Sequence, residues 1–454
     1  MRMEKRFHNF NGGGIFMFKI TFLGAGSTIF AKNVLGDCIL TPELGEFEIA
    51  LFDIDEQRLN ESYKMLCNIN DNYNGKATIN KYLDRKESLK NAKYIVNAIQ
   101  VGGYEPCTVW DFEIPKKYGL RQTIGDTLGV AGIFRALRTI KVLEDIAVDI
   151  KEVCPNALFI NYSNPMAMLT GYLEKYLGIR TIGLCHSVQY CVKGLLETFK
   201  MEEYIDNCDW TIYGINHQAW LLELKDNDGN DLYPIIKAKN LEEGSNYNKD
   251  WDLVRLEMMK RFGYYITESS EHTAEYTPWF IKDKYPDLID EFKIPLDEYP
   301  RRCIKQINDW QQMKKDVVDA KVVEHTKSYE FASYIIKAIE TKTTYRVHGN
   351  VMNTLGLIPN LPREACVEVP CLVDQNGINP CAQKPLPEIC AAINRTNINV
   401  QILAMEGAHK RSRTLVYQAA SLDPHTASEL SLADIQALCD ELFEVEKDYL
   451  GEYN

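Results

Sequence analysis

The sequence lacks the features that mark a membrane protein or a reader of nucleic acids. It contains no run of about 18 apolar residues that could span a bilayer. Acidic residues outnumber basic ones by 64 to 51, and no stripe of Lys and Arg with interleaved aromatic residues occurs. We therefore expect a small-molecule partner, with neither a membrane nor a nucleic acid involved.

The sequence also lacks the signs of a secreted disulfide scaffold. Its 13 cysteines are an odd number in a long chain, and no apolar signal segment precedes them. No Cys-x-x-Cys pair is present, which argues against a structural zinc site. We expect reduced cysteines and a cytoplasmic protein.

The stretch "MFKITFLGAGST" reads as an apolar strand that runs into a glycine turn, and the next stretch, "IFAKNVLGDCIL", reads as a helix. Gly24 and Gly26 match the first two glycines of the dinucleotide-binding pattern G-x-G-x-x-G, but Ile29 stands at the third position. The turn formed by Gly24, Ala25, Gly26 and Ser27 is the predicted site for the cofactor phosphates.

The following apolar strand, "EFEIALFDID", ends in acidic residues. Asp53 lies 27 residues after Gly26, near the spacing of the carboxylate that accepts the ribose hydroxyls of NAD. Asp55 is the weaker alternative. A glycine turn alone is a common loop, but the turn together with Asp53 favours a dinucleotide site.

Strands and helices continue to alternate as far as "IRTIGLCHS". Repeated strand-helix units predict an α/β fold with a Rossmann-type, doubly wound parallel sheet. Ligands bind such sheets beyond the carboxyl ends of the strands. The residues that fall there are the turn 24–27, Asp53, Asn97, which we assign to the cofactor, Asn164 and Cys185.

From about residue 200 the pattern changes to mixed strands and helices rich in Tyr, Trp and His. We predict a flexible N-terminal extension over residues 1–16, which lack apolar periodicity and end in a glycine run. A Rossmann-like NAD-binding domain then covers 17–195. An α+β domain for substrate binding and oligomerisation covers 196–454.

Cys185 and His217 are candidate metal ligands. A thiolate and a neutral imidazole can hold Mn²⁺ or a related ion and leave coordination positions open for substrate. The alternative is a buried strand-end cysteine and a hydrogen-bonded core histidine, which the spacing alone favours. His186 points away from Cys185 in an extended chain, so it serves either substrate recognition or the surface.

Two further polar residues border predicted loops. Asn164 precedes a proline, which keeps it out of a helical conformation and presents its amide at a strand end, either toward substrate or in a simple turn. Asp126 lies in a glycine-punctuated loop that enters a helix, where it serves either the site or the loop itself.

The stretch "SSEHTAEYTPWF" brings together Glu271, His272, Glu275 and Tyr276. These side chains are candidates for proton transfer, although most residues in such a cluster are structural.

Six linked motifs resemble, in order and spacing, those of the NAD- and manganese-dependent family 4 glycoside hydrolases, most closely the melibiose-cleaving α-galactosidases. The likeness runs from about Lys19 to past residue 430. The family fold is similar to that of lactate and malate dehydrogenases, a Rossmann domain followed by an α+β domain. The motifs are "KITFLGAGSTIF", "IQVGGYEPCTVWDFEIPKKYGL", "NYSNPMAM", "GLCHSVQ", "GINH" and "TESSEHTAEYTPWFIK".

The residues after Cys185 bear on the substrate. Family members that act on 6-phosphorylated sugars carry Cys-Asn-[Val/Ile]-Pro, whereas this chain has Cys-His-Ser-Val, which is similar to the α-galactosidases. The resemblance thus implies hydrolysis of a non-phosphorylated α-galactoside such as melibiose, a role in carbohydrate metabolism. The net charge of −13 agrees, because a neutral sugar needs no electropositive funnel.

The resemblance implies a redox-assisted elimination. NAD⁺ takes hydride from C3 of the galactoside, the resulting ketone acidifies the C2 proton, a base removes that proton, and the aglycone departs. Water then adds to the enone, and NADH reduces the ketone. No pair of carboxylates at glycosidase spacing is needed.

The resemblance also implies residue roles. Cys185 and His217 bind Mn²⁺, which holds the C2 and C3 oxygens. Tyr276 is the C2 base, with Glu271 and Glu275 left open. Asp126 supports the metal site or acts on the leaving group, and the substrate-binding residues are Asn164 and His186.

Other functions stay open at this point. One is another family 4 activity, an α-glucosidase or a uronidase, although no cationic side chain for a uronate is assignable. A second is a 2-hydroxy acid dehydrogenase, which needs a His beside an Asp and a substrate-binding Arg but no metal cysteine. A third is a non-catalytic NAD-responsive protein. The family is commonly a homodimer or homotetramer.

Overall fold

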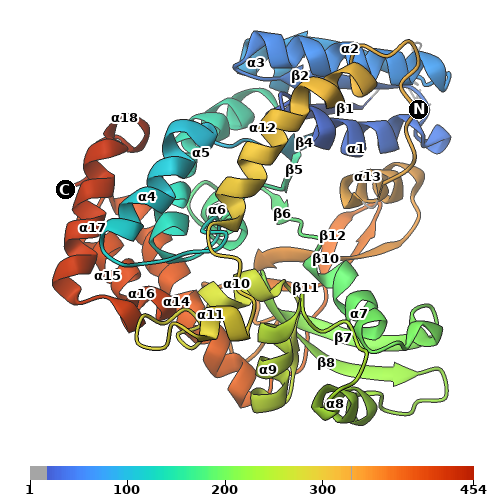
Figure 1. Cartoon of the computed structure of the whole chain (residues 1–454). Coiled ribbons are helices and arrows are strands. Elements are labelled where there is room, and N and C mark those ends of the chain that lie inside the picture. The colour runs from blue at the N-terminus through green and yellow to red at the C-terminus, as the bar shows by residue number, and fades with distance from the viewer. Residues whose placement is uncertain (1–17, 329) are drawn as a thin grey trace, which may run out of the picture.

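The computed structural model describes residues 18–328 and 330–454, so the predicted extension over residues 1–16 lies outside it. The strands form one 12-stranded sheet (Figure 1), in the order β3-β2-β1-β4-β5-β6-β10-β11-β7-β8-β9, with β12 paired to β11. The first six strands of this order are parallel, and the remainder are antiparallel. The predicted parallel sheet is therefore confirmed as one half of a longer mixed sheet.

The parallel half has the strand order of a dinucleotide-binding fold. From β1 the strand order runs outward in one direction to β2 and β3 and in the other to β4, β5 and β6. This switch between β1 and β4 opens a crevice beyond the carboxyl ends of the two neighbouring parallel strands. The six strands are β1 (Lys19–Leu23), β2 (Phe47–Phe52), β3 (Ala77–Tyr82), β4 (Tyr94–Asn97), β5 (Leu158–Asn161) and β6 (Thr181–Gly183).

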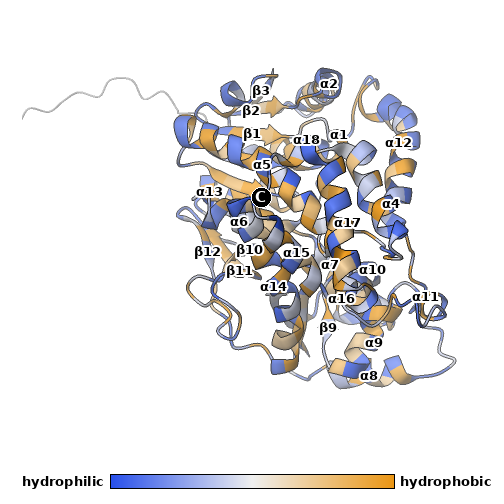
Figure 2. Cartoon of the chain, turned by 90° about the vertical axis from the view of Figure 1, so that its left-hand side faces the viewer, coloured by the Kyte–Doolittle hydropathy of each residue, from blue (hydrophilic) through white to orange (hydrophobic). Residues whose placement is uncertain are grey.

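Each face of the parallel half is covered by helices, because its strands are apolar on both sides. Ile20 and Phe22 pack into one core, whereas Leu23, Ile95 and Phe159 pack into the other. Figure 2 shows the hydrophobic strands β1 and β2 beneath helices with polar outer faces. The helices are α1 (Thr28–Ile39), α2 (Glu56–Asn72) and α13 (Phe331–Thr341) on the first side, and α3 (Arg85–Leu89), α4 (Val109–Lys117), α5 (Gly129–Val153) and α6 (Met166–Lys175) on the second.

The antiparallel half continues the same sheet. Asn350 of β10 pairs with Gly183 of β6, and this contact joins the two halves. The predicted boundary after residue 195 falls within α7 (Ser187–Thr198), so the division into two domains stays a prediction. The remaining strands are β7 (Cys208–Ile215), β8 (Gln218–Asp226), β9 (Tyr265–Ile266), β10 (Tyr345–Met352), β11 (Cys366–Asp374) and β12 (Gly377–Pro380).

The C-terminal helices return to the parallel half and complete the second core around α5 and α6. None of the helices in the described ranges is long and apolar enough to cross a membrane. All 13 cysteines are free thiols. The other helices are α8 (Tyr233–Leu241), α9 (Leu253–Phe262), α10 (Ser270–Glu275), α11 (Leu288–Glu291), α12 (Glu298–Val317), α14 (Glu388–Lys410), α15 (Arg413–Leu422), α16 (Pro424–Glu429), α17 (Leu432–Val445), α18 (Lys447–Leu450) and the short turns η1 (Pro42–Leu44), η2 (Gly103–Thr108) and η3 (Glu202–Tyr204).

A buried ionic cluster ties α5 to α4 and to the C-terminal helices. Arg138 of α5 donates to both carboxylate oxygens of Asp111, at 3.0 and 2.5 Å, and to Glu446 at 3.2 Å. All three side chains are almost fully buried. Because two carboxylates share one guanidinium, removing the cation leaves both of them buried without a counter-charge.

We expect Arg138→Met to lower the free energy of unfolding by about 3 kcal/mol or more, the loss typical of a broken buried ion pair. Urea-induced unfolding followed by circular dichroism measures it. Lys86→Met is the control, because Lys86 forms an ion pair with Glu152 at the surface and its loss should change little. Equal stability of the two variants would contradict a structural role for the buried cluster.

Candidate active site

The turn between β1 and α1 has the geometry of a phosphate cradle. Gly24 has a φ of +86°, and a Cβ there would lie 2.8 Å from the Ala98 carbonyl oxygen, so only glycine fits. The N–H groups of Gly24 and Ala25 both donate to the Phe52 carbonyl oxygen at 3.0 Å, which fixes the turn against β2. Ser27 makes no side-chain capping bond, so the first turn of α1 keeps its N–H donors for an anion.

Asp53 lies at the carboxyl end of β2, beside this turn. Its Oδ2 accepts the Gly26 N–H at 2.6 Å, and its Oδ1 accepts the Asp55 N–H at 2.9 Å. Asp55 instead caps α2 through its own carboxylate, which accepts from the backbone N–H of Arg58. The structure therefore places Asp53, rather than the alternative Asp55, next to the glycine turn.

Asn97 ends β4, on the other side of β1. It is fully buried, and its Nδ2 donates to Asn161 Oδ1 at 3.0 Å and to Ser163 Oγ at 3.2 Å. Its Oδ1 has no hydrogen-bond partner in the part of the chain that the structure describes. An oriented, unpaired amide oxygen at this edge fits a cofactor that spans the crevice.

Three potential metal donors meet just beyond the carboxyl end of β6. Cys185 Sγ, His217 Nε2 and the Glu268 carboxylate lie within 4.8 Å of one another. Glu268 Oε2 is 3.9 Å from the sulfur and 3.5 Å from the histidine nitrogen. His217 occupies the tight turn between β7 and β8 with a φ of +61°, a strained conformation typical of functional positions. Glu268 was not among the candidate ligands predicted from the sequence.

The donor set fits a divalent transition metal, because thiolate, imidazole and carboxylate ligands together suit Mn²⁺ and related ions. Burial and the charge of Glu268 raise the pKa of Cys185 to about 11, and a bound cation favours the thiolate. Thr267 Oγ1 and Glu368 Oε2, both buried, lack hydrogen-bond partners among the described residues. Such unsatisfied polar atoms fit a site that holds a polar ligand.

His186 directly precedes α7 and has a helical backbone conformation, with φ −84° and ψ −9°, rather than the extended one on which the prediction was based. Its Nε2 lies 2.9 Å from Glu330 Oε2, and its ring stacks near Tyr162 and Phe331, at centroid distances of 6.4 and 5.9 Å. Contact with Glu330 leaves Nδ1 as the ring atom able to reach a substrate. The substrate-binding role of His186 stays a prediction.

Asp126 and Asn164, predicted separately, lie in contact. Asn164 Nδ2 donates to Asp126 Oδ2 at 2.9 Å, and His272 Nε2 is 3.8 Å from Asp126 Oδ1. Burial opposes the charged carboxylate, but His272 and the cation of Arg135 outweigh it and lower the pKa of Asp126. Because the His272 ring lies 4.6 Å from that of His217, Asp126 and Asn164 form one site with the metal donors.

Tyr276 is the proton-transfer candidate that contacts a metal donor. Its hydroxyl lies 2.8 Å from His217 Nδ1, and burial raises the pKa of this tyrosine well above its usual value. Glu275 instead accepts the backbone N–H groups of residues 123–125, and Glu271 forms a 3.6 Å ion pair with Arg302. The two glutamates thus have structural partners, and the choice of Tyr276 as base stays a prediction.

The structure places a cation beside Asn164, whereas no cationic side chain for a uronate was assignable from the sequence. Arg135, on α5, donates through Nε to the Asn164 carbonyl oxygen at 3.4 Å. Helical periodicity could not separate it from Arg138, because residues three apart share one side of a helix. The position of the loop that carries Asn164 shows that Arg135, and not Arg138, lies next to this loop.

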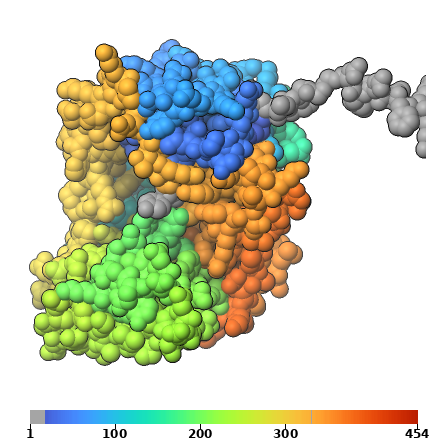
Figure 3. All heavy atoms as spheres, turned by 90° about the vertical axis from the view of Figure 1, so that its right-hand side faces the viewer, coloured from blue at the N-terminus to red at the C-terminus, as the bar shows by residue number. Residues whose placement is uncertain are grey.

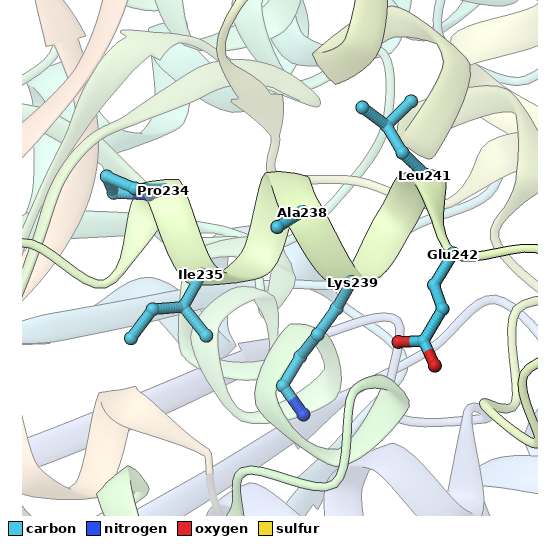
Figure 4. A pocket seen from close by; sticks show the side chains of 6 residues that line it. All are labelled: Pro234, Ile235, Ala238, Lys239, Leu241 and Glu242. Atoms are coloured by element: carbon cyan, nitrogen blue, oxygen red, sulfur yellow. The ribbon is translucent and has the colours of Figure 1, made fainter.

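The molecule is hollowed between the N-terminal strands and helices and the segment around residue 200, as Figure 3 shows. A separate shallow hollow lies along α8, lined by Pro234, Ile235, Ala238, Lys239, Leu241 and Glu242 (Figure 4). None of the predicted site residues lines this second hollow. The candidate catalytic and metal-binding residues lie at the sheet instead.

The description "Family 4 glycosyl hydrolase" belongs to a family model that matches residues 19–201, and the model of that family's C-terminal domain matches residues 212–426. The chain belongs to glycosyl hydrolase family 4. The resemblance of the six motifs is thereby confirmed, and so is the assignment of the chain to the hydrolases.

Relatives of this family 4 glycosyl hydrolase include an α-galactosidase of Bacillus subtilis, 58% identical over 96% of this chain and 100% of the relative. A 6-phospho-α-glucosidase from gut microorganisms, solved in complex with NAD and Mn²⁺, has a TM-score of 0.80 at 20% identity and covers 96% and 100% of the two chains. Malate dehydrogenase from Plasmodium falciparum reaches 0.53 at 15% identity over 88% and 100%. The dehydrogenase-like Rossmann fold is thus confirmed.

We expect Glu268→Gln to weaken Mn²⁺ binding about tenfold or more, since even residues beside metal ligands contribute tenfold effects. Electron paramagnetic resonance titration of chelator-treated protein measures the free ion directly. Glu271→Gln is the matched control, because Glu271 pairs with Arg302 outside the donor set. Unchanged affinity in the Glu268 variant would remove this residue from the metal site.

We expect Asp53→Asn to weaken NAD⁺ binding about tenfold, because a hydrogen bond to a carboxylate is stronger than one to an amide. Isothermal titration calorimetry measures the dissociation constant. Asp55→Asn serves as the control, since asparagine also caps a helix well. A loss of affinity in the Asp55 variant alone would reverse the assignment.

Proposed function

We propose that this protein is an α-galactosidase that hydrolyses non-phosphorylated α-galactosides such as melibiose. The observation that carries the proposal is the 58% identity, over nearly the whole chain, to the B. subtilis α-galactosidase. The sequence Cys-His-Ser-Val at residues 185–188 supports a substrate without a phosphate. We further propose a cytoplasmic homodimer or homotetramer, with an NAD-binding domain at 17–195 and a substrate domain at 196–454.

The proposed cofactors are NAD and Mn²⁺ or another divalent transition metal. The glycine turn 24–27, Asp53 and Asn97 would hold NAD, and Cys185, His217 and Glu268 would hold the metal. When bound, NAD supplies a reversible hydride acceptor, and the metal supplies a Lewis acid for the oxygens at C2 and C3 of the sugar.

The proposed base is Tyr276, because His217 can prepare it for proton removal. With Nε2 directed at the metal donors, Nδ1 would carry the ring proton and donate a hydrogen bond to the Tyr276 oxygen, 2.8 Å away. A hydrogen bond received by the tyrosine oxygen favours the phenolate, which offsets the effect of burial. Tyr276 would then take the proton from C2 of the sugar.

Asp126 is proposed as an acceptor that orients the site rather than as an acid. Its lowered pKa keeps it ionised, so it has no proton to give to the leaving group. It holds the Asn164 amide group at 2.9 Å and faces His272, and Asn164 would contact the sugar hydroxyls from this fixed position. Pre-organised charge of this kind is typically the main contribution to catalysis.

A 2-hydroxy acid dehydrogenase is the second candidate. The pair Asp126 and His272, with Arg135 nearby, supplies the residue types that such an enzyme needs. Cys185 and Glu268 would then have no function, and they favour the metal-dependent glycosidase instead.

We expect hydrolysis of p-nitrophenyl α-galactoside by chelator-dialysed protein only when NAD⁺, Mn²⁺ and a thiol reductant are all returned. Cys185→Ser should be inactive, Tyr276→Phe should lose about 10²- to 10⁴-fold in kcat, and Cys208→Ser, a change at the start of β7, should stay active.

Two outcomes would contradict the proposal. Turnover without NAD⁺ or metal, once bound cofactor is excluded by mass spectrometry, would exclude the redox mechanism. NADH formation from lactate or malate without a metal would favour the dehydrogenase.

A further inference from the structure

Arg135 is a buried cation that forms no ion pair within 4 Å with a described carboxylate, although Asp126 interacts with its charge over a longer distance. Its side chain is 8% exposed, and none of the described carboxylate oxygens lies within 4 Å of its guanidinium. Its hydrogen bonds are all 3.4 Å long and reach neutral acceptors, the Asn164 carbonyl oxygen and the Tyr299 hydroxyl. Arg138, three residues further along α5, has two carboxylate partners instead.

This arrangement leaves the guanidinium with unused binding capacity. Arginine is always charged in proteins and carries five N–H donors in a planar fork. Contacts of 3.4 Å are longer than ordinary N–H···O hydrogen bonds, and a buried charge without close partners is costly. The Tyr299 ring, 5.5 Å from the guanidinium, offsets only part of that cost. A ligand with oxygen atoms close to the guanidinium would supply the hydrogen-bond acceptors that these N–H donors lack.

A short chain of contacts connects Arg135 to the metal donors. Its Nε touches Asn164, whose amide donates to Asp126, and Asp126 faces His272, whose ring packs on His217. A ligand held among Asn164, Asp126 and the metal donors would therefore lie beside the guanidinium.

We infer that Arg135 is a substrate-binding residue whose guanidinium donates hydrogen bonds to two neighbouring oxygens of the sugar. This inference rests on the proposed function, because that function places a glycoside in the site. A planar fork matches paired oxygens, which are two hydroxyl groups in a galactoside or one carboxylate in a galacturonide. Arg135 would then determine whether the site prefers a sugar with paired hydroxyl groups or one with a carboxylate.

The test compares Arg135→Met, Arg135→Lys and Tyr299→Phe, each loaded with NAD⁺ and Mn²⁺, on p-nitrophenyl α-galactoside. Arg135→Met should lower kcat/KM about 10- to 100-fold, mainly through KM, because charged hydrogen bonds to the substrate are lost. Arg135→Lys should recover part of the loss, since it keeps the charge without the fork. Tyr299→Phe should stay near the unmodified protein, and Mn²⁺ and NAD⁺ affinities should be unchanged throughout.

Two results would overturn the assignment. One is a kcat/KM for Arg135→Met within twofold of the unmodified protein. The other is an equal loss in Tyr299→Phe, which would mean that Arg135 only holds the start of α12 in place.

Calorimetric titration with D-galactose and with D-galacturonate separates this inference from the proposed function. Binding of either sugar that Arg135→Met loses supports the assignment, even if the unmodified protein hydrolyses no α-galactoside. Tighter binding of galacturonate identifies a carboxylate as the preferred group, and tighter binding of galactose identifies the hydroxyls. Equal binding by the variant, or no binding of either sugar by the unmodified protein, overturns it.

Discussion

The pairing of β10 with β6 is the contact on which the candidate active site depends. It is formed where Asn350 meets Gly183, and a Cβ on Gly183 would come within 2.5 Å of Met166 Sδ and 3.0 Å of the Asn350 Cβ. A glycine therefore lets the antiparallel half join the parallel sheet. Through β11 this junction also carries β7, whose turn places His217 near Cys185. Without the junction, the two metal donors would belong to unconnected sheets.

Charge is concentrated around this junction although most of the surrounding side chains are buried. Burial opposes the ionisation of Asp126 and Glu268, but the neighbouring histidines lower the pKa of both, helped by Arg135 at Asp126 and by Arg255 at Glu268. Electrostatic interactions are stronger in such a site than in water, and the groups need not reorganise during a reaction. Figure 1 shows α12 crossing from this region to α2, where Lys314 pairs with Glu61, so the helix that bears Tyr299 is anchored at both ends.

Sequence reasoning anticipated the parallel half because its signals are local. An apolar strand, a glycine turn and a helix follow one another within about 20 residues, and Asp53 follows at the next strand end. The linked motifs also identified the family, which the family models confirm. Glu268 went unrecognised although it lies inside a quoted motif, because nothing in its neighbourhood distinguishes a metal donor from an ordinary surface glutamate.

The sequence by itself determined the Rossmann half and its glycine turn, since both depend on periodicity or spacing along the chain, and the resemblance of its linked motifs indicated family 4. Only the tertiary structure decided that Glu268 joins Cys185 and His217, that Tyr276 contacts His217, and that Arg135 rather than Arg138 faces the site. The physical reason is that these contacts join segments separated by tens of residues. Their distances follow from strand pairing between the two halves of the sheet, which no local pattern encodes.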